Sequence, residues 1–126
     1  MSNISTRAFV QTGNNVTIAG VIVEGGSGED VLVRALGPTL ADPPFNVPNV
    51  LANPTLELRN ANRVLLQAND NWKDTQQTQI AATQKAPKKD AESAIFRTLV
   101  PGNYTAIVRG KNNSVGNALI DVYEIP

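Results

Sequence analysis

The sequence predicts an all-β fold, an antiparallel β-sandwich or jelly roll of about eight strands with one short helix. Short segments rich in β-branched residues recur at roughly 8–12-residue spacing, and Gly, Asn and Pro mark the turns between them. Hydrophobic residues make up 41% of the chain, which is enough to build a core. Because ~100–150 residues is the commonest domain size, we expect residues 1–126 to form a single β-sandwich domain.

Three strands are expected in the first part of the chain, at residues 4–10, 16–24 and 31–36. The middle strand is unusual because both of its faces are apolar, whereas a strand of an exposed sandwich normally has one polar face. One face carries Thr17, Ala19, Val21 and Val23, and the other carries Val16, Ile18, Gly20 and Ile22. Both faces therefore need a cover.

Two alternatives remain open for what packs on the outer face of this strand. Either the proline-rich loop and Phe9 cover its outer face within the chain, or another copy of the domain does so. In the second case the strand at 4–10 is available to pair in trans, because an exposed edge strand is a template for another chain. The interface between copies would then comprise Ile4, Val10, Val16, Ile18, Val21 and Val23.

Residues 37–54 form a segment of a different kind. Five of the eight prolines fall here, at Pro38, Pro43, Pro44, Pro48 and Pro54. Proline removes a backbone donor and fixes φ, which excludes a helix or an inner strand. The segment also carries the apolar residues Leu40, Phe45, Val47, Val50 and Leu51. We expect a stiff loop that packs over one end of the core, with Phe45 buried.

The second half supplies the remaining elements. Residues 55–61 and 63–68 predict a hairpin with Leu56 and Leu58 facing inward. Asp74 is expected to cap a short helix over 75–84. The last three strands are expected at 92–100, 103–109 and 117–125.

The composition excludes much of enzyme chemistry. The chain has no His and no Cys, so it has no imidazole base, thiolate nucleophile or disulfide. A carboxylate pair such as Asp70 and Asp90 would formally serve a glycosidase, but the aromatic cleft expected beside it is missing. The 11 basic and 11 acidic residues cancel, which argues against nucleic acid as a partner. No apolar run approaches the ~20 residues of a membrane span.

The densest group of oxygen ligands is Asn69, Asp70, Asn71, Asp74, Asp90 and Glu92. Calcium binds about six to eight such oxygens in irregular geometry, which makes a site built on Asp70, Asp74, Asp90 and Glu92 a candidate. The alternative is structural: an Asx turn at 69–71 and a helix cap at Asp74.

Two further groups have open interpretations. Phe45, Trp72, Tyr104 and Tyr123 are either a sugar-stacking platform or core and loop anchors. Arg7 and Arg34 lie among apolar neighbours, and a buried arginine needs a carboxylate, for which Asp121 and Glu57 are candidates.

Several blocks of the chain resemble an accessory domain of large secreted bacterial proteins. These blocks lie at 3–8, 12–16, 33–38, 69–72, 90–94 and 101–110. The resemblance implies an extracellular β-sandwich that occurs singly or in tandem, and it implies no activity. The second half is also similar to the bacterial pre-peptidase C-terminal domain, through the blocks at 69–72 and 101–105. That similarity implies a jelly roll, and some such domains bind calcium and help secreted enzymes engage matrix substrates.

The sequence therefore favours a non-catalytic structural or adhesive module that packs against like domains, as a tandem repeat, a homo-oligomer or a fibre. We expect it outside the cell or at the cell surface, with no signal peptide in this chain. The alternative function is a carbohydrate- or matrix-binding accessory module of a secreted enzyme, with a surface or matrix polysaccharide as its partner.

Overall fold

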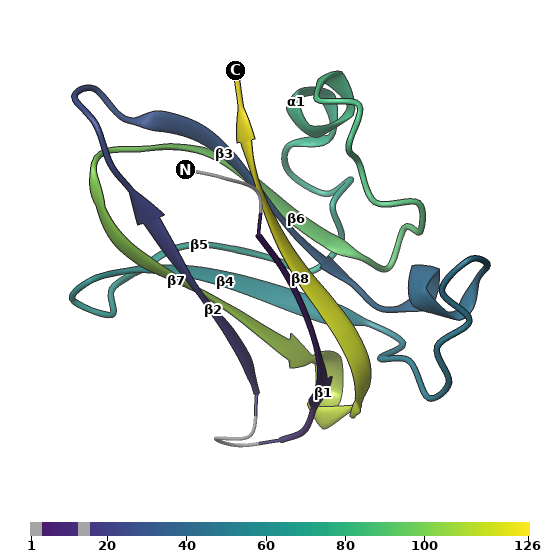
Figure 1. Cartoon of the computed structure of the whole chain (residues 1–126). Coiled ribbons are helices and arrows are strands. Elements are labelled where there is room, and N and C mark those ends of the chain that lie inside the picture. Colours follow the sequence, from purple (N-terminus) through teal and green to yellow (C-terminus); the bar gives the residue numbers. More distant parts are fainter. Residues whose placement is uncertain (1–3, 13–15) are drawn as a thin grey trace.

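A computed structural model describes residues 4–12 and 16–126 of the chain (Figure 1). Within these ranges the chain forms eight strands, one α-helix and two short 3₁₀ helices. The strands are β1 (Ile4–Val10), β2 (Thr17–Val23), β3 (Glu29–Leu36), β4 (Pro54–Asn60), β5 (Leu65–Asn69), β6 (Ser93–Leu99), β7 (Gly102–Gly110) and β8 (Gly116–Ile125). The helices are η1 (Pro38–Ala41), α1 (Gln77–Ala82) and η2 (Lys111–Asn113). None of these helices is long and apolar enough to cross a membrane.

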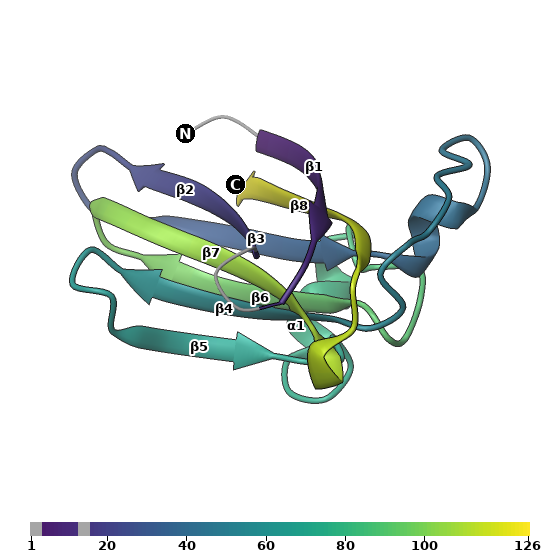
Figure 2. The same cartoon turned by 90° about the horizontal axis from the view of Figure 1, so that it is seen from below.

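The strands form two four-stranded antiparallel sheets in the orders β1-β8-β3-β6 and β2-β7-β4-β5. Figure 2 shows them as two stacked layers, with β1 and β2 on one side of the sandwich and β5 and β6 on the other. We call these the β1/β2 side and the β5/β6 side. This strand order is that of a jelly roll, so the predicted fold class is confirmed.

The main core lies between the two sheets and follows the period of two that a pleated strand imposes. In β2 the burial alternates at every residue, with Val21 and Val23 inside and Ile18 and Ile22 outside. In β4, Leu56 and Leu58 are buried, as the sequence predicts. The outer face of β2 is therefore not covered by the proline-rich loop: Ile18 and Ile22 are each 56% exposed.

A second, smaller core lies on the outer face of the β1-β8-β3-β6 sheet. It is formed by Leu32, Trp72, Ile80 and Ala94. The residues between β5 and β6, which include α1, supply Trp72 and Ile80 and so cover part of this face. Trp72 and Tyr104 are both buried, which supports their role as core anchors.

The helix differs from the prediction. It spans Gln77–Ala82 rather than 75–84, and Gln76 occupies the N-cap position without a side-chain cap bond. The Asp74 backbone N–H donates to the Asn71 carbonyl oxygen at 3.0 Å, so Asp74 lies in a turn before the helix. The expected Asp74 cap is therefore wrong, because the turn ends before the helix begins.

The proline-rich segment is an ordered loop that packs on the core, as expected, although Phe45 is not buried. Leu40 and Leu51 are fully buried, and the Leu51 N–H donates to the Asn117 carbonyl oxygen at 2.8 Å. A Cβ on Gly37 would lie 2.0 Å from the Leu51 carbonyl oxygen, so only glycine allows this close approach. Phe45 is 48% exposed, and its N–H donates to the Asp42 carbonyl oxygen at 3.0 Å in a turn of the loop.

The loop contributes to stability through its buried leucines rather than through Phe45. We expect Leu51→Ala to lower the free energy of unfolding by about 2–5 kcal/mol, because it leaves a cavity in the core. Phe45→Ala should cost about 1 kcal/mol or less, since half of the ring is already in water. Urea denaturation of the two variants measures both values. Equal losses of unfolding free energy would show that Phe45 stabilises the loop as much as Leu51 does, contrary to this expectation.

Candidate functional site

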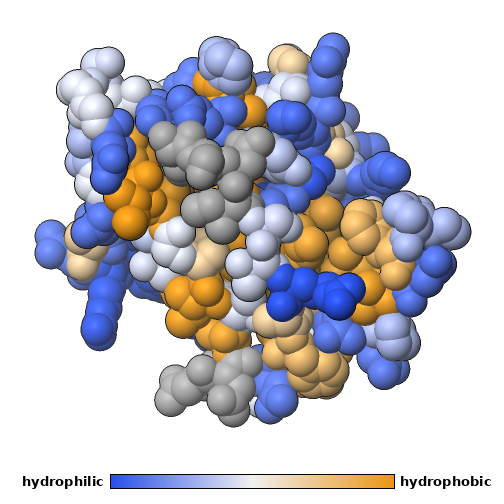
Figure 3. All heavy atoms as spheres, in the orientation of Figure 1, coloured by the Kyte–Doolittle hydropathy of each residue, from blue (hydrophilic) through white to orange (hydrophobic). Residues whose placement is uncertain are grey.

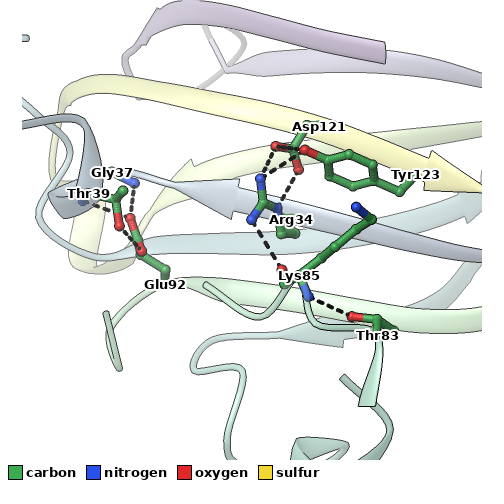
Figure 4. A network of polar contacts seen from close by, with 8 residues as sticks. All are labelled: Arg34, Gly37, Thr39, Thr83, Lys85, Glu92, Asp121 and Tyr123. Carbon is green, nitrogen blue, oxygen red and sulfur yellow. Dashed lines mark hydrogen bonds and ion pairs between the residues drawn. The ribbon is translucent and has the colours of Figure 1, made fainter. Parts of the chain in front are cut away.

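The carboxylate of Glu92 is buried at one end of the sandwich and is 0% exposed. Its Oε2 accepts hydrogen bonds from the Gly37 N–H at 2.8 Å and the Thr39 N–H at 2.9 Å. Its Oε1 accepts from the Thr39 hydroxyl at 2.5 Å and the Lys89 N–H at 3.2 Å. These donors replace the water that a buried carboxylate loses. Glu92 thereby ties two segments together, the loop after β3 and the segment before β6 (Figure 4).

Arg34 on β3 and Asp121 on β8 form a bidentate ion pair. The Arg34 Nε donates to Asp121 Oδ1 at 2.8 Å, and Nη2 donates to Oδ2 at 2.5 Å. Burial alone would lower the pKa of Arg34, but the hydrogen bond and the charge of Asp121 outweigh it and raise this pKa. The charged form of Arg34 therefore persists throughout the physiological pH range. The predicted need of Arg34 for a carboxylate is confirmed, and Asp121 is the partner rather than Glu57.

Arg34 also holds the segment that follows α1. Its Nη1 donates to the Lys85 carbonyl oxygen at 3.1 Å, and its Nη2 donates to the Tyr123 hydroxyl at 3.2 Å. The Lys85 Nζ lies 4.8 Å from the centre of the Tyr123 ring, on which the Arg34 guanidinium also stacks (Figure 4). The segment carrying Lys85 is thus fixed to β3 and β8.

These contacts surround a hollow of about 280 Å³, which we call the Arg34 pocket. It is lined by Arg34, Leu36, Thr39, Phe45, Gln84, Lys85, Ala86 and Lys88. One wall is the loop after β3, and the other is the segment after α1. An ion pair of 3.0 Å between Lys89 and Asp42 joins the two walls. The lining is basic and partly apolar, which suits a small anionic group with a ring or hydrocarbon part.

A second hollow lies on the outer face of the β2-β7-β4-β5 sheet. Its volume is about 420 Å³, and we call it the Ile18 hollow. It is lined by Ile18, Arg59, Asn60, Arg63, Thr105 and Ile107. Gly20 pairs with Thr105 on this face, and a Cβ on Gly20 would meet no atom within 4 Å. The missing side chain leaves the middle of the face open.

The four carboxylates predicted to bind calcium do not converge. Asp70 forms an ion pair of 2.7 Å with Lys111, and this hydrogen bond raises the pKa of Lys111. Asp90 pairs with Lys73 at 2.9 Å, and Glu92 is enclosed by its own donors. Across residues 4–12 and 16–126, no three acidic side chains lie together in a way that could hold a metal ion. The calcium site built on Asp70, Asp74, Asp90 and Glu92 is therefore wrong.

The predicted interface residues divide between the two faces of their strands. Val10, Val21 and Val23 are buried in the main core, so their assignment to an interface is wrong. They alternate with outward-facing neighbours, and a two-residue period cannot place both sets on one surface. Ile18 is exposed and Val16 is partly exposed, while the side chain of Ile4 lies outside the described part of the chain.

Two side-chain amides act on β6 in a way that sequence reasoning missed. Gln76 Oε1 accepts from the Phe96 N–H at 3.0 Å, and Gln76 Nε2 donates to the Phe96 carbonyl at 2.8 Å. Asn69 Oδ1 accepts from the Ala94 N–H at 3.0 Å. These amides occupy backbone groups of β6 that would otherwise be open to another strand. In the sequence, Asn69 and Gln76 look like ordinary turn and helix-start residues, so no signal marks this role.

The comparisons with known proteins agree with this architecture. No protein-family model and no curated protein matches the chain. Among solved structures, the chain is similar to the pre-peptidase C-terminal domain of a collagenase from Bacillus anthracis, with a TM-score of 0.58 and 11% sequence identity. The match covers 96% of this chain and 89% of that one. The chain thus has the β-sandwich fold of a pre-peptidase C-terminal domain, which confirms that resemblance for the fold and extends it beyond the second half.

Glu92 contributes to the stability of the fold through buried hydrogen bonds. Its replacement can therefore be compared with the same kind of change at Asp90, whose carboxylate lies at the surface. We expect Glu92→Gln to lower the free energy of unfolding by about 1.5–3 kcal/mol, because an amide NH₂ would face donors that now meet a carboxylate oxygen. Asp90→Asn removes a carboxylate that is 78% exposed in a surface ion pair, and it should cost less than about 1 kcal/mol. Chemical denaturation measures both. Similar losses would show that the Glu92 bonds contribute no more than a surface pair.

Proposed function

We propose that the chain is a non-catalytic accessory module of an extracellular or cell-surface protein, and that it packs against like domains through its β1/β2 side. The fold is that of a domain of a collagenase, and the absence of His and Cys removes imidazole and thiolate chemistry. The like domains are neighbours in a tandem repeat or copies in a homo-oligomer or fibre.

The observation that carries this proposal is the difference between the two sides of the sandwich. On the β5/β6 side, Asn69 and Gln76 occupy the edge of β6, and the Arg97 Nη1 donates to the Leu66 carbonyl of β5 at 3.1 Å. Blocking of edges by side chains is how proteins prevent unwanted strand pairing. On the opposite side, β1 and β2 each have one neighbouring strand among the described residues. Their free edges are available for strand addition.

The side chains near these free edges also favour association. Phe9 on β1 and Ile18 and Ile22 on β2 are all about half exposed. Figure 3, in the orientation of Figure 1, shows apolar side chains over β2 on this face. A second copy is the partner that fits best, because antiparallel pairing of two β2 strands would join the β2-β7-β4-β5 sheets of the two copies and bring Ile18 and Ile22 of each copy onto one shared face.

Single substitutions on β2 test the assembly without touching the core. We expect the solution mass of the wild-type protein to rise with concentration in sedimentation equilibrium. Ile18→Lys should remain a monomer across the same series with an unchanged melting temperature, because it places a charge on the shared face. Gly20→Lys should act alike, since a Cβ at Gly20 meets no atom within 4 Å.

The matched control is Leu65→Lys on β5, a half-exposed leucine on the blocked side, which should assemble as the wild type does. A wild-type protein that stays monomeric at high concentration would contradict the proposal. So would Ile18→Lys and Leu65→Lys variants that weaken assembly equally.

A second candidate function is binding of a surface or matrix polysaccharide. A row of sugar-stacking aromatics is not available for it, because Trp72 and Tyr104 are buried. Phe45 remains, half exposed at the Arg34 pocket, and this single observation keeps the candidate open.

A further inference from the structure

The charges around the Arg34 pocket are not balanced locally. Arg34 is neutralised by Asp121, and Lys89 is neutralised by Asp42. Within the described part of the chain, Lys85 and Lys88 form no ion pair with a carboxylate. The negative charge of Glu92 also acts on Arg34, and the Glu92 oxygens accept hydrogen bonds from Gly37, Thr39 and Lys89. Lys85 and Lys88 therefore line the hollow without an ion-pair partner among the described residues, and the Lys85 Nζ also lies 4.8 Å from the centre of the Tyr123 ring.

Phe45 adds an apolar surface beside these cations. Phe45 lines the pocket and is 48% exposed, although the backbone that carries it is held in place. The Phe45 and Asn46 N–H groups both donate to the Asp42 carbonyl, at 3.0 and 3.1 Å. An exposed aromatic ring on a fixed turn presents a flat surface at a low cost in conformational entropy.

The walls of the pocket are fixed before any ligand arrives. Glu92 bonds to Thr39 on one wall and to Lys89 next to the other, and the Arg34 side chain holds the Lys85 carbonyl. The Lys89–Asp42 ion pair spans the rim. A site held in this way loses little freedom on binding, which favours affinity from few contacts.

The volume of the pocket and the blocked edge of β6 beside it favour a single sugar ring over a peptide as the ligand. About 280 Å³ lies just under the ~300–1,000 Å³ of typical drug-sized sites, so it suits one ring rather than an extended molecule. A peptide would gain most by pairing with a strand edge, but β6 beside β3 is blocked by Asn69 and Gln76. A sugar ring needs no strand edge: it stacks on an aromatic face and bonds through its substituents.

We propose that the Arg34 pocket binds a uronic acid residue of an acidic polysaccharide. The sugar ring packs on Phe45, its carboxylate lies between Lys85 and Lys88, and its hydroxyl groups reach the Gln84 amide. This deepens the second candidate function and does not depend on assembly through the β1/β2 side. Because it concerns a different surface, either proposal can fail while the other stands.

The test is a titration of the ¹⁵N-labelled protein with trigalacturonic acid, followed by NMR. We expect the amide signals of Phe45, Lys85 and Lys88 to shift, and the affinity to fall as salt is raised. The methyl-esterified trisaccharide keeps the rings and loses the charges, so it should bind at least about tenfold more weakly. This is the change in Kd that loss of one charge-assisted hydrogen bond produces.

Substitutions assign the roles within the pocket. The double variant Lys85→Gln, Lys88→Gln should weaken binding by at least about tenfold, and Phe45→Ala should weaken binding of the charged and esterified trisaccharides alike. The control Lys73→Gln, Lys111→Gln removes two surface lysines elsewhere and should bind as the wild type does. Thermal unfolding of each variant checks that it is folded at the temperature of the titration.

Three results would overturn the proposal. The first is no binding of trigalacturonic acid, and the second is equal binding of its methyl ester. The third is tighter binding of a triglutamate peptide than of trigalacturonic acid, which would make the pocket a site for acidic peptides instead.

Discussion

A carboxylate in a protein interior must find enough donors to replace its lost water, and Glu92 meets this constraint by drawing on two segments far apart in the sequence. Its bonds to Gly37 and Thr39 fix the start of the proline-rich loop, and its bond to Lys89 fixes the segment before β6. In the same loop, Gly37 lies close to Leu51 and Leu40 is fully buried. The loop is therefore part of the folded core at this end of the sandwich, and the Arg34 pocket is the space that remains between the two fixed segments.

The two outer faces of the sandwich, and its two pairs of edge strands, differ in how far they are covered by other parts of the chain. The outer face of the β1-β8-β3-β6 sheet carries a second core under α1, while the outer face of the other sheet leaves Ile18 and Ile22 in water. The edge of β6 is occupied by side-chain amides, whereas the edges of β1 and β2 remain free among the described residues. Covered faces and blocked edges favour solubility, and uncovered ones favour association. One jelly roll thus has two separate surfaces, a β1/β2 side with exposed apolar side chains and a pocket lined partly by basic residues.

Local patterns predicted most of the fold. The alternation of Leu56 and Leu58 with polar residues marked an inner strand, and the turn residues marked eight strands close to their observed bounds. The Arg34–Asp121 pair could also be predicted from the sequence, because a buried arginine needs a carboxylate partner and the chain offers few candidates. The predicted calcium site failed because it assumed that Glu92 is free, and its donors Gly37 and Thr39 lie more than 50 residues away in the sequence. Phe45 was predicted to be buried for its hydrophobicity alone, but it lies in a turn at Asp42 where the residue is 48% exposed.

If Glu92 holds the loop and the walls of the pocket together, amide hydrogen exchange near its donors should depend on its carboxylate. In the wild-type protein the Gly37 and Thr39 amides, which donate to Glu92, should exchange as slowly as those of the inner strand β7. In Glu92→Gln these two amides and those of Val47 and Leu51 should exchange at least about tenfold faster, while β7 stays protected relative to the loop. Uniform acceleration across the whole chain, or unchanged exchange at Gly37 and Thr39, would show that Glu92 does not hold the loop in place.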